Sequence, residues 1–484
     1  MAAQAPRANP PRVVRGVFVW FGRFASFTIL RALAGEHDHF MATSSTPSPF
    51  TFPTLDAWLT HLESAHPVGI DMGLTRISQV RDALGLTFKC PVITVGGTNG
   101  KGSTCAIIET ILVRAGYRVG CHTSPHLLDF NERARLNGAD ATNDELLEHF
   151  EAVEQARMSL ADPVSLTYFE FTTLAIMRLF ASRDLDAVIL EVGLGGRLDA
   201  VNIIDTDCAI VTSIDIDHTE YLGDTREKIG FEKAGIFRPN TPAICGDPSP
   251  PQSLIDHAKA IGADLWLVGR DFRYEAQGGN ERQQWSYIGR TQRRSALAYP
   301  ALRGANQLIN TSAALAALEA LRDRIPVSAQ DIRLGLANVE LPGRFQVVPG
   351  KPQVILDVAH NPHAAAVLAQ NLGNMGFFPY TYAVFGAMGD KDIAGVVEHL
   401  KGEIDHWNVT ALPTPRAASS AMLESVLRHA GVNDSSDSSV TQFNNPADAF
   451  QDALKRASEN DRILVFGSFH TVAGVMAYRK SQRH

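Results

Sequence analysis

The segment at residues 91–116 constrains the fold of this chain more than any other part of its sequence. An apolar run at 92–95 predicts a buried strand, which ends at Gly96 and Gly97 and leads through a short loop into a helix expected at 104–114. Glycines let backbone N–H groups fold around an anion, and the N-terminus of the following helix adds positive potential. The segment therefore predicts a polyphosphate cradle, although an ordinary strand-to-helix turn would give the same pattern.

The residues of this loop narrow the kind of phosphate site. Lys101 is expected to reach the outer phosphates of a bound nucleotide. The spacing differs from that of the usual P-loop, because only three residues separate Gly97 from Lys101 and because Gly102 follows the lysine. This departure favours a subset of the ATP-binding proteins.

The length and the pattern of apolar residues predict two domains. A chain of 484 residues exceeds the size at which a single core usually splits. From about Leu55, short apolar strands alternate with amphipathic helices, which predicts an α/β fold with a P-loop NTPase-type parallel-sheet domain followed by a smaller Rossmann-like α/β domain. In the first domain we expect strands at 92–95, 187–192, 208–214 and 243–245, helices at 104–114, 144–159, 168–182 and 306–322, and antiparallel strands or loops at 271–300. In the second we expect strands at 354–358, 382–385 and 463–466, a helix at 362–372 and a surface loop at 431–440.

The expected domain boundaries follow changes in composition. We expect the ATP-binding domain at 41–340, a linker at 341–346 and the C-terminal domain at 347–484. Residues 1–40 are interpreted as a start-site artefact or a disordered extension, because Met41 precedes a loop-like stretch and is the better start. The apolar run of this extension is interrupted by Arg15, Arg23 and Arg31. It therefore does not predict a membrane span.

Charge and cysteine content exclude several classes of partner. The net charge of -8 and the lack of a long basic stripe argue against a nucleic-acid-binding protein. The five cysteines form no CxxC pair and lie in apolar settings, which predicts reduced, buried thiols in a cytoplasmic protein without a zinc site.

Polar residues at the carboxyl ends of strands are candidates for metal binding. Glu191 lies near the carboxyl edge of the predicted sheet, opposite the phosphate loop, where a carboxylate suits Mg²⁺. His218 follows another strand and reaches the same edge, which favours a functional role over the more common structural one. Lys233 is either a salt-bridged helix lysine or part of the site.

Ten short motifs carry a family resemblance, in order, from about residue 55 to the C-terminus. In the first domain they are GTNGKGS (97–103), SPHL (124–127), LTYFE (166–170), the stretch at 190–200, DHT (217–219) and EKAGI (232–236). LPGRFQ (341–346) forms the expected linker, and the motifs of the second domain are DVAHNPH (357–363), DKD (390–392) and GSFH (467–470). The chain resembles the folylpolyglutamate synthases of the Mur-ligase superfamily, and it is most similar to the bacterial bifunctional dihydrofolate synthase/folylpolyglutamate synthases.

This resemblance implies a set of nucleotide, metal and catalytic residues. The ATP contacts would be Thr98, Asn99, Gly100, Lys101, Gly102, Ser103, Asn310, Arg344 and Asp357. The Mg²⁺ ligands would be Ser124, Glu191, His218 and Lys233, the last as a carbamate formed with CO₂, which turns a cation into an anionic oxygen ligand. Lys101, Lys233 and His360 would be catalytic. Some of His360, Lys391, Ser468 and His470 would hold the incoming glutamate or the acyl phosphate.

The resemblance also implies a dihydropteroate site. Its residues would be Asp71, Met72, Gly73, Thr167, Tyr168, Phe169, Glu170, Leu198, Asp199 and Ala200. The intact LTYFE and RLDA sequences fit enzymes that also make dihydrofolate. Asp199 and Glu170 would accept hydrogen bonds from the pterin, unless they serve in helix capping or interdomain packing.

The implied activity is ATP-dependent ligation of L-glutamate to dihydropteroate and to folyl-(poly)glutamates through an acyl phosphate, in folate biosynthesis. The resemblance implies a cytoplasmic monomer with small-molecule substrates and without nucleic-acid or membrane partners. The alternatives are a folylpolyglutamate synthase only, a Mur-type amino-acid ligase, or a nucleotide-dependent switch, although the guanine-reading N-K-x-D sequence of GTPases is lacking.

Overall fold

The computed structural model describes residues 50–277, 284–304 and 306–482. The interpretation of residues 1–40 as an artefact or extension lies outside the described residues. We call residues 50–340 the first lobe and residues 346–482 the second lobe. Each lobe is built around a mainly parallel sheet, as the alternation of strands and helices predicts.

The first lobe contains an eight-stranded sheet in the order β4-β3-β2-β5-β1-β6-β7-β8. The strands are β1 (Val92–Gly96), β2 (Val119–His122), β3 (Ala134–Leu136), β4 (Ala139–Asp140), β5 (Ala187–Glu191), β6 (Cys208–Val211), β7 (Pro242–Cys245) and β8 (Asp264–Leu267). The strands from β2 to β8 in this order run parallel, and only β3 and β4 pair antiparallel at one edge. An antiparallel three-stranded sheet, β9 (Arg273–Gln277), β10 (Gln284–Ile288) and β11 (Arg293–Ala298), occupies the region expected to hold strands or loops.

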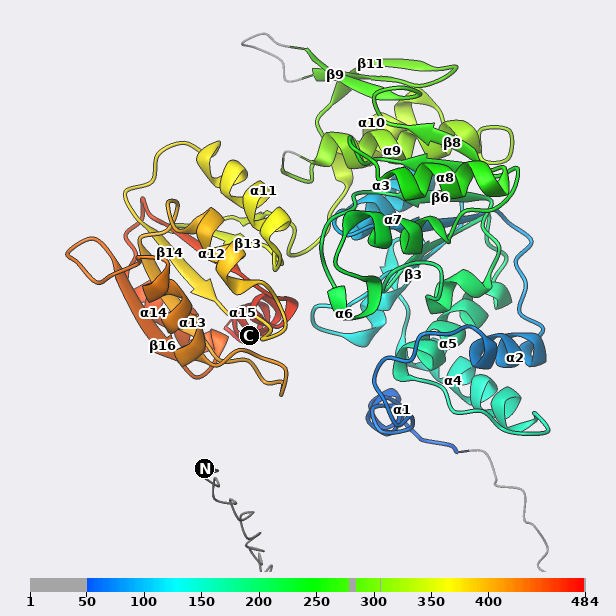
Figure 1. Ribbon diagram of the computed structural model, residues 1–484, viewed down its shortest axis with the longest axis horizontal. Helices are drawn as coiled ribbons and strands as arrows, with labels where there is room; N and C mark the ends of the chain where they lie inside the picture. Colours follow the sequence, from blue (N-terminus) through cyan, green and yellow to red (C-terminus); the bar gives the residue numbers. More distant parts are fainter. Residues whose placement is uncertain (1–49, 278–283, 305, 483–484) are drawn as a thin grey trace, which may run out of the picture. The chain divides into compact units, whose positions relative to one another are not determined.

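Helices cover both faces of the first sheet. They are α1 (Leu55–Leu62), α2 (Thr75–Leu84), α3 (Lys101–Arg114), α4 (Asn143–Met158), α5 (Tyr168–Ser182), α6 (Thr219–Leu222), α7 (Arg226–Ala234), α8 (Gln252–Ile261), α9 (Gln307–Ala320) and α10 (Ala329–Asn338), with 3-10 turns η1 (Phe130–Arg133) and η2 (Ala200–Ile203). Ile93 and Val95 pack with α3, α9 and α10, whereas Val92 packs with the opposite helices, because alternate residues of a strand face opposite sides. Figure 1 shows α9 and α10 beside α3, and α4 beside α5.

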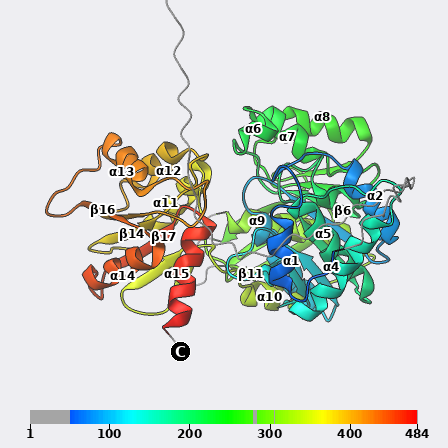
Figure 2. The ribbon, with the colours of Figure 1, turned by 90° about the horizontal axis from the view of Figure 1, so that it is seen from below.

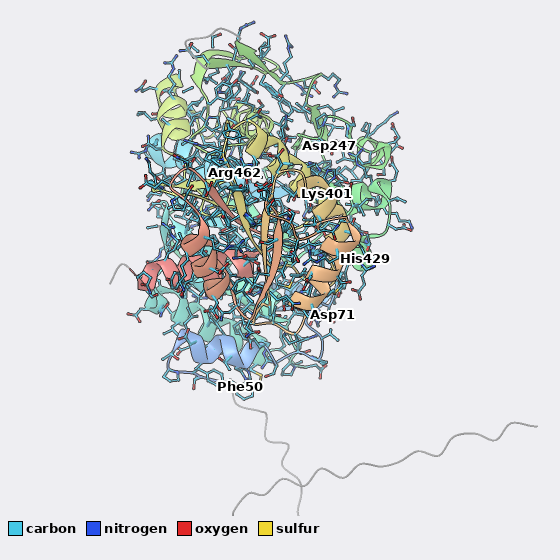
Figure 3. The ribbon with its side chains drawn as sticks, turned by 90° about the vertical axis from the view of Figure 1, so that its left-hand side faces the viewer. Phe50, Asp71, Asp247, Lys401, His429 and Arg462 are labelled. Carbon is cyan, nitrogen blue, oxygen red and sulfur yellow. The ribbon has the colours of Figure 1, made fainter. Side chains whose placement is uncertain are left out.

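The second lobe contains a six-stranded sheet in the order β12-β13-β17-β14-β15-β16. Its elements are β12 (Gln346–Val348), β13 (Gln353–Leu356), α11 (Pro362–Gly373), β14 (Thr381–Phe385), α12 (Ile393–Leu400), β15 (His406–Thr410), α13 (Ser420–His429), β16 (Ser439–Phe443), α14 (Pro446–Arg456), β17 (Arg462–Phe466) and α15 (Phe469–Ser481). Figure 2 shows three layers, with α11, α12 and α13 on one face of the sheet and α14 and α15 on the other. Arg462, labelled in Figure 3, is buried at the start of β17 and donates hydrogen bonds to Thr381 Oγ1 and to the Leu372 carbonyl.

Several expected ends of helices, strands and loops differ from the observed ones, and each difference has a structural reason. α3 begins at Lys101, three residues before the expected start at Thr104, because Gly100 caps it in the left-handed conformation. β6 ends at Val211 and not at 214, because residues 212–214 leave the sheet to hold the phosphate loop. The expected loop at 431–440 overlaps β16, which pairs in parallel with β15 from Ser439 onward.

The expected linker at 341–346 lies where the cores of the two lobes change. Leu341 packs against a cluster of the first lobe, and Phe345 belongs to a cluster of the second. β12 begins at Gln346, the last residue of the expected linker. The division into domains at these residues stays a prediction.

All five cysteines carry free thiols, four of them buried and Cys90 partly buried, so the expectation of buried thiols was wrong for Cys90. In the part of the chain that the structure describes, no helix combines the length and apolarity needed to cross a membrane.

Candidate active site

The phosphate loop is held in shape by glycines and by the segment that follows β6. Gly97 and Gly100 have φ values of 142° and 89°, which side chains rarely adopt. The Thr98 N–H donates to the Ser213 carbonyl at 2.6 Å, and Thr212 Oγ1 donates to the Asn99 carbonyl at 2.7 Å. Hydrogen bonds within the chain therefore fix the shape of the loop.

Lys101 is the first residue of α3, so its N–H and those of Gly102 and Ser103 belong to the free first turn of the helix. Its ammonium group folds back over the loop and donates to the carbonyls of Gly97 at 3.0 Å and Thr98 at 3.2 Å. A cation beside the free N–H groups of a helix N-terminus is the arrangement that a polyphosphate cradle requires, and phosphate binding by these residues stays a prediction.

The predicted metal ligands lie around the same cavity. Glu191, at the end of β5, is 4% exposed and accepts a hydrogen bond from the Ser124 N–H at 3.0 Å. Burial raises the pKa of Glu191, and Lys101 counteracts this. Ser124 Oγ is buried and has no hydrogen-bond partner among the described residues. His218 has a left-handed backbone, φ 50°, at the start of α6.

Lys233 is 3% exposed on α7 and has no ion-pair partner in the part of the chain that the structure describes. Burial, followed by repulsion from Lys101, lowers its pKa to about 7. The interpretation of Lys233 as a salt-bridged helix lysine was therefore wrong. Over residues 50–277, 284–304 and 306–482, no three His, Cys, Asp or Glu side chains gather at one metal-sized site. A metal here would need the hydroxyl of Ser124, a modified Lys233 or ligand oxygens in addition to Glu191 and His218.

The predicted dihydropteroate residues lie next to this cavity but do not line it. The cavity has a volume of about 1050 Å³ and is bounded by the phosphate loop, the metal-ligand candidates and second-lobe residues. The backbone at Gly193, part of its wall, approaches Phe169 so closely that a Cβ there would lie 2.6 Å from the ring. At Gly195 a Cβ would lie 3.8 Å from Met72.

The two carboxylates expected to meet the pterin are already bonded to the chain. Asp199 caps η2, and its oxygens accept from the N–H groups of Leu194 at 2.8 Å and Val201 at 3.0 Å. Burial raises the pKa of Asp199 to about 6. Glu170 forms a capping box at the start of α5 and an ion pair with Arg76 at 3.0 Å. The capping role is thus present for both, and a carboxylate has lone pairs left for a further donor.

The remaining predicted nucleotide residues come from the second lobe, from the segment that joins the lobes and from α9 of the first lobe. Asp357 accepts from the N–H groups of Phe345 and Ala359, both at 2.7 Å. Arg344 lies with its guanidinium carbon 5.0 Å from the Phe469 ring centroid, and its Nη1 is buried without a partner among the described residues. Asn310, on α9, is 7% exposed and faces Gly100, where a Cβ would lie 2.6 Å from Asn310 Oδ1.

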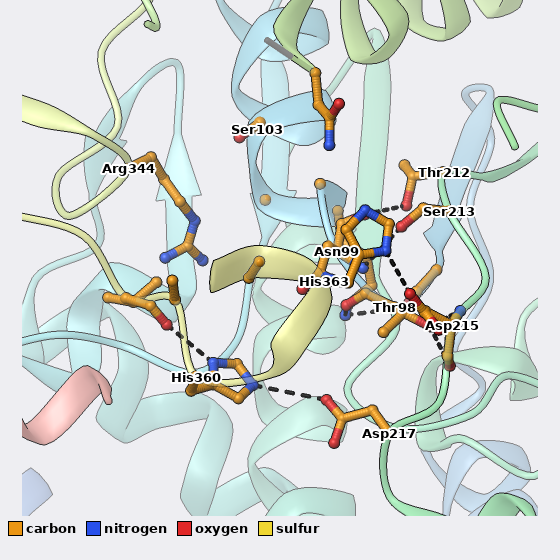
Figure 4. Close-up of a pocket in the computed structure, with 18 of the residues that line it drawn as sticks. Thr98, Asn99, Ser103, Thr212, Ser213, Asp215, Asp217, Arg344, His360 and His363 are labelled. Atoms are coloured by element: carbon orange, nitrogen blue, oxygen red, sulfur yellow. Dashed lines mark hydrogen bonds and ion pairs between the residues drawn. The ribbon is translucent and has the colours of Figure 1, made fainter. Parts of the chain in front are cut away.

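One ion pair and two histidine–carboxylate contacts join the two lobes across the cavity, and the sequence did not predict them. Lys391 Nζ lies 2.6 Å from Asp217 Oδ1, and His360 Nε2 lies 3.7 Å from Asp217 Oδ2. His363 Nδ1 lies 2.7 Å from Asp215 Oδ2. Figure 4 shows His360 directed at Asp217 and His363 directed at Asp215.

The pKa of Asp217 reflects these contacts. Burial alone would raise it, but His360, His218 and Lys391 hold the pKa of Asp217 well below its usual range. His360 Nδ1 lies 2.9 Å from the Val358 carbonyl, which can only accept, so this nitrogen carries the proton. The sequence placed Asp217 after a strand and Lys391 in a motif, but nothing in the spacing paired them.

Family models match most of both lobes. The Mur ligase middle domain matches residues 95–318, and the Mur ligase glutamate ligase domain matches residues 343–469. The fold and the site therefore define an ATP-dependent ligase of the Mur type.

Full-length relatives narrow this class. The dihydrofolate synthase/folylpolyglutamate synthase of Escherichia coli (strain K12) is 43% identical over 437 residues, which are 90% of this chain and 98% of the relative. That of Haemophilus influenzae is 42% identical over 440 residues, 87% of this chain and 96% of the relative. The chain belongs to the dihydrofolate synthase/folylpolyglutamate synthase family.

Solved structures agree with this assignment. Escherichia coli FolC in complex with DHPP and ADP superposes with a TM-score of 0.81 at 43% identity, covering 91% of this chain and 99% of that one. The bifunctional folylpolyglutamate synthase/dihydrofolate synthase of Yersinia pestis complexed with AMPPNP and Mn ion superposes with a TM-score of 0.80 at 42% identity, covering 90% of this chain and 100% of that one.

Proposed function

We propose that this protein uses ATP to ligate L-glutamate to dihydropteroate, giving dihydrofolate, and to folyl-(poly)glutamates, extending their tails. The observation that carries the proposal is one continuous cavity of about 1050 Å³ that is lined by the phosphate loop, by Glu191 and by His360. A nucleotide site on one lobe thus faces the second lobe's motif residues, which is the arrangement that a two-substrate transfer requires.

The first step activates a carboxylate. The loop N–H groups and Lys101 hold the phosphates, and Asn310, Arg344 and Asp357 hold the rest of the nucleotide. A carboxylate oxygen of the acceptor attacks the γ-phosphorus, the bond to the bridging oxygen breaks, and ADP leaves. The resulting acyl phosphate has phosphate as a leaving group, whereas a free carboxylate would have to expel oxide.

The residues around the phosphate loop fit a divalent cation. The unpartnered Ser124 Oγ, the buried Glu191 carboxylate and the imidazole of His218 are oxygen and nitrogen donors on one cavity wall. When bound, Mg²⁺ would supply positive charge to the phosphate oxygens. Lys101 contributes to the same stabilisation from the protein side.

The second step forms the amide. Second-lobe residues such as His360 and Lys391 hold the glutamate, and its neutral amine attacks the acyl carbon. The bond to the phosphate oxygen breaks as the amide forms, and the released phosphate takes up the proton that the nitrogen loses. The dihydropteroate residues around Phe169 and Asp199 position the acceptor. Contacts between the lobes keep water away from the acyl phosphate, which it would otherwise hydrolyse.

Carbamylation of Lys233 belongs to this proposal. Lys233 is a buried amine without a carboxylate partner in the described part of the chain, so its positive charge is unfavourable there. Conversion to an anionic carbamate would replace this charge with an oxygen ligand for a metal cation. Intact-mass measurement under CO₂ and after acid treatment would show the adduct. An unmodified lysine under CO₂ and Mg²⁺ would contradict it.

We further propose that the protein is a cytoplasmic monomer. Light scattering of the purified protein would test its assembly state.

ADP release with each substrate omitted tests the function. We expect turnover only when ATP, glutamate and a pterin acceptor are all present. Turnover that needs neither pterin nor glutamate would contradict the ligase. Activity with tetrahydrofolate but not with dihydropteroate would indicate a folylpolyglutamate synthase only, and activity with a UDP-muramyl acceptor would indicate a Mur-type amino-acid ligase.

A further inference from the structure

Arg133 presents a charged guanidinium to the cavity without a carboxylate partner in the described part of the chain. Glu191 and Glu132 are the carboxylates whose charge acts on Arg133, but both accept hydrogen bonds from other groups of the chain. Glu191 accepts from the Ser124 N–H, and Glu132 accepts from the N–H groups of residues 127–129. Arg133 is partly buried, and a partly buried cation without an anionic partner is unfavourable, so an anion from outside the chain would complement it.

The side chain of Arg133 is held in one orientation. Its Nε donates to His126 Nδ1 at 2.8 Å, and its guanidinium carbon lies 5.7 Å from the Phe130 ring centroid and 5.8 Å from that of Tyr168. Its carbonyl accepts from the Thr123 N–H at 3.2 Å, which ties it to the strand end that carries Ser124. With Nε occupied and the aromatic rings nearby, the terminal N–H groups remain as donors.

Most other cations of the cavity already have a partner or a proposed role. Lys101 covers the phosphate loop, Lys391 pairs with Asp217, Arg226 pairs with Asp247 and Arg416 pairs with Asp390. Arg344 is proposed for ATP and Lys233 for carbamylation, whereas Arg303 is exposed and has no assigned role. Arg135, two residues after Arg133, is paired with Glu109 at 2.7 Å. Arg135 is thus neutralised by a carboxylate of the chain, whereas Arg133 is free to bind an anionic ligand.

We propose that Arg133 binds the α-carboxylate of a glutamyl unit, either of the incoming glutamate or of the first glutamate of a folate acceptor. A planar guanidinium matches a carboxylate with two parallel hydrogen bonds. The guanidinium of Arg133 lies over the ring of Tyr168, a dihydropteroate candidate, and lines the same cavity as Ser124, a metal-ligand candidate. In the proposed function, the acceptor and glutamate would meet in this part of the cavity. This inference rests on the proposed function.

Steady-state kinetics of Arg133→Gln test the inference. A lost charged hydrogen-bond pair of about 1.5–3 kcal/mol corresponds to a KM increase of roughly ten- to a hundredfold. If the ligand is the incoming glutamate, its KM rises with both acceptors. If the ligand is the folate tail, the KM of tetrahydrofolate rises, while that of dihydropteroate, which has no α-carboxylate, does not. The KM of ATP stays unchanged in both cases.

Two further variants keep the test decisive. Arg428→Gln removes a surface arginine that pairs with Glu424, and it is expected to behave as wild type. Should Arg133→Gln fail to fold, Arg133→Lys keeps the charge but loses the planar fork, and the same KM is expected to rise by a smaller factor. Unchanged KM values for glutamate and tetrahydrofolate in a folded Arg133 variant, with active wild type, overturn the inference alone. An inactive wild type overturns the proposed function and this inference together.

Discussion

At the scale of single residues, the site contains two groups of charged side chains. The first group already forms helix caps or ion pairs within the chain, and the second group has no charged partner in the described part of the chain. Asp199 and Glu170 cap helices, and Asp217 pairs with Lys391. Lys101 instead donates only to carbonyl groups, which phosphate oxygens can replace as partners. The second group is therefore the one that a ligand can engage directly.

Replacing Lys101 with Ala is expected to lower kcat about 10²–10³-fold, because it removes a cation from the phosphates in the transition state. The melting temperature should change little, because the lost contacts are hydrogen bonds to two loop carbonyls. ADP release and thermal unfolding are the measurements. The control is Lys351→Ala, whose side chain is 70% exposed. A variant within about threefold of wild-type kcat would contradict the assignment of Lys101.

The lowered pKa of His149 predicts that the free energy of unfolding depends on pH. This histidine is 2% exposed on α4, and burial, followed by Arg178, lowers its pKa from 6.5 to about 4. The folded state thus resists a proton that the unfolded state takes up, so stability falls as pH falls from 6.5 towards 4. Over the whole window this single group contributes up to roughly 3 kcal/mol.

Urea unfolding of wild type and His149→Gln between pH 7 and pH 4 tests this prediction. The variant, which cannot titrate, is expected to lose less stability than wild type over that range. Equal losses in the two proteins would show that His149 does not contribute.

At the scale of elements, the junction of β1 and α3 builds the phosphate loop. Gly100 has φ 89° and faces Asn310, whereas Gly116, after the end of α3, has φ 88° and open space around the position that a Cβ would take. The two glycines therefore share a backbone conformation and differ in their surroundings.

This pair provides a matched comparison. Gly116→Ala is expected to cost about 1–2 kcal/mol from backbone strain alone. Gly100→Ala adds a contact of 2.6 Å between its Cβ and Asn310 Oδ1, so it should cost more and should also weaken ADP binding. Urea unfolding and calorimetric titration with ADP measure both effects. Equal destabilisation and equal ADP affinity in the two variants would contradict the role of Gly100.

Local sequence patterns predicted the elements better than the details of the site. The periodicity identified α5 at its observed bounds, Tyr168–Ser182, because apolar spacing and the Thr167 cap act locally. β15, with the mixed sequence HWNVT, was missed because its burial depends on its neighbours in the sheet. The pairing of Asp217 with Lys391 could not be predicted from local sequence patterns either, because the two residues are 174 positions apart.

At the scale of the whole molecule, ion pairs connect the lobes around the cavity. Asp217 and Lys391 each have side chains only 10% exposed, so their attraction is screened little by solvent. The motifs of both lobes meet in this contact, which couples the arrangement of the lobes to the site.

A double-mutant cycle with Asp217→Asn and Lys391→Gln tests this coupling. Each single change is expected to lower kcat at least about tenfold, because each leaves a charge without its partner. The double variant should be no worse than the poorer single variant, which gives a coupling energy of about 1 kcal/mol or more. Strictly additive losses in kcat would show that the two residues act independently.

The central claim is that ATP activates the carboxylate of the acceptor before glutamate attacks. Dihydropteroate labelled with heavy oxygen in its carboxylate, incubated with ATP and glutamate, tests this claim directly. We predict that one labelled oxygen appears in the released inorganic phosphate and that the other remains in the amide of dihydrofolate. Phosphate free of label after amide formation would contradict the acyl phosphate and with it the mechanism proposed for this site.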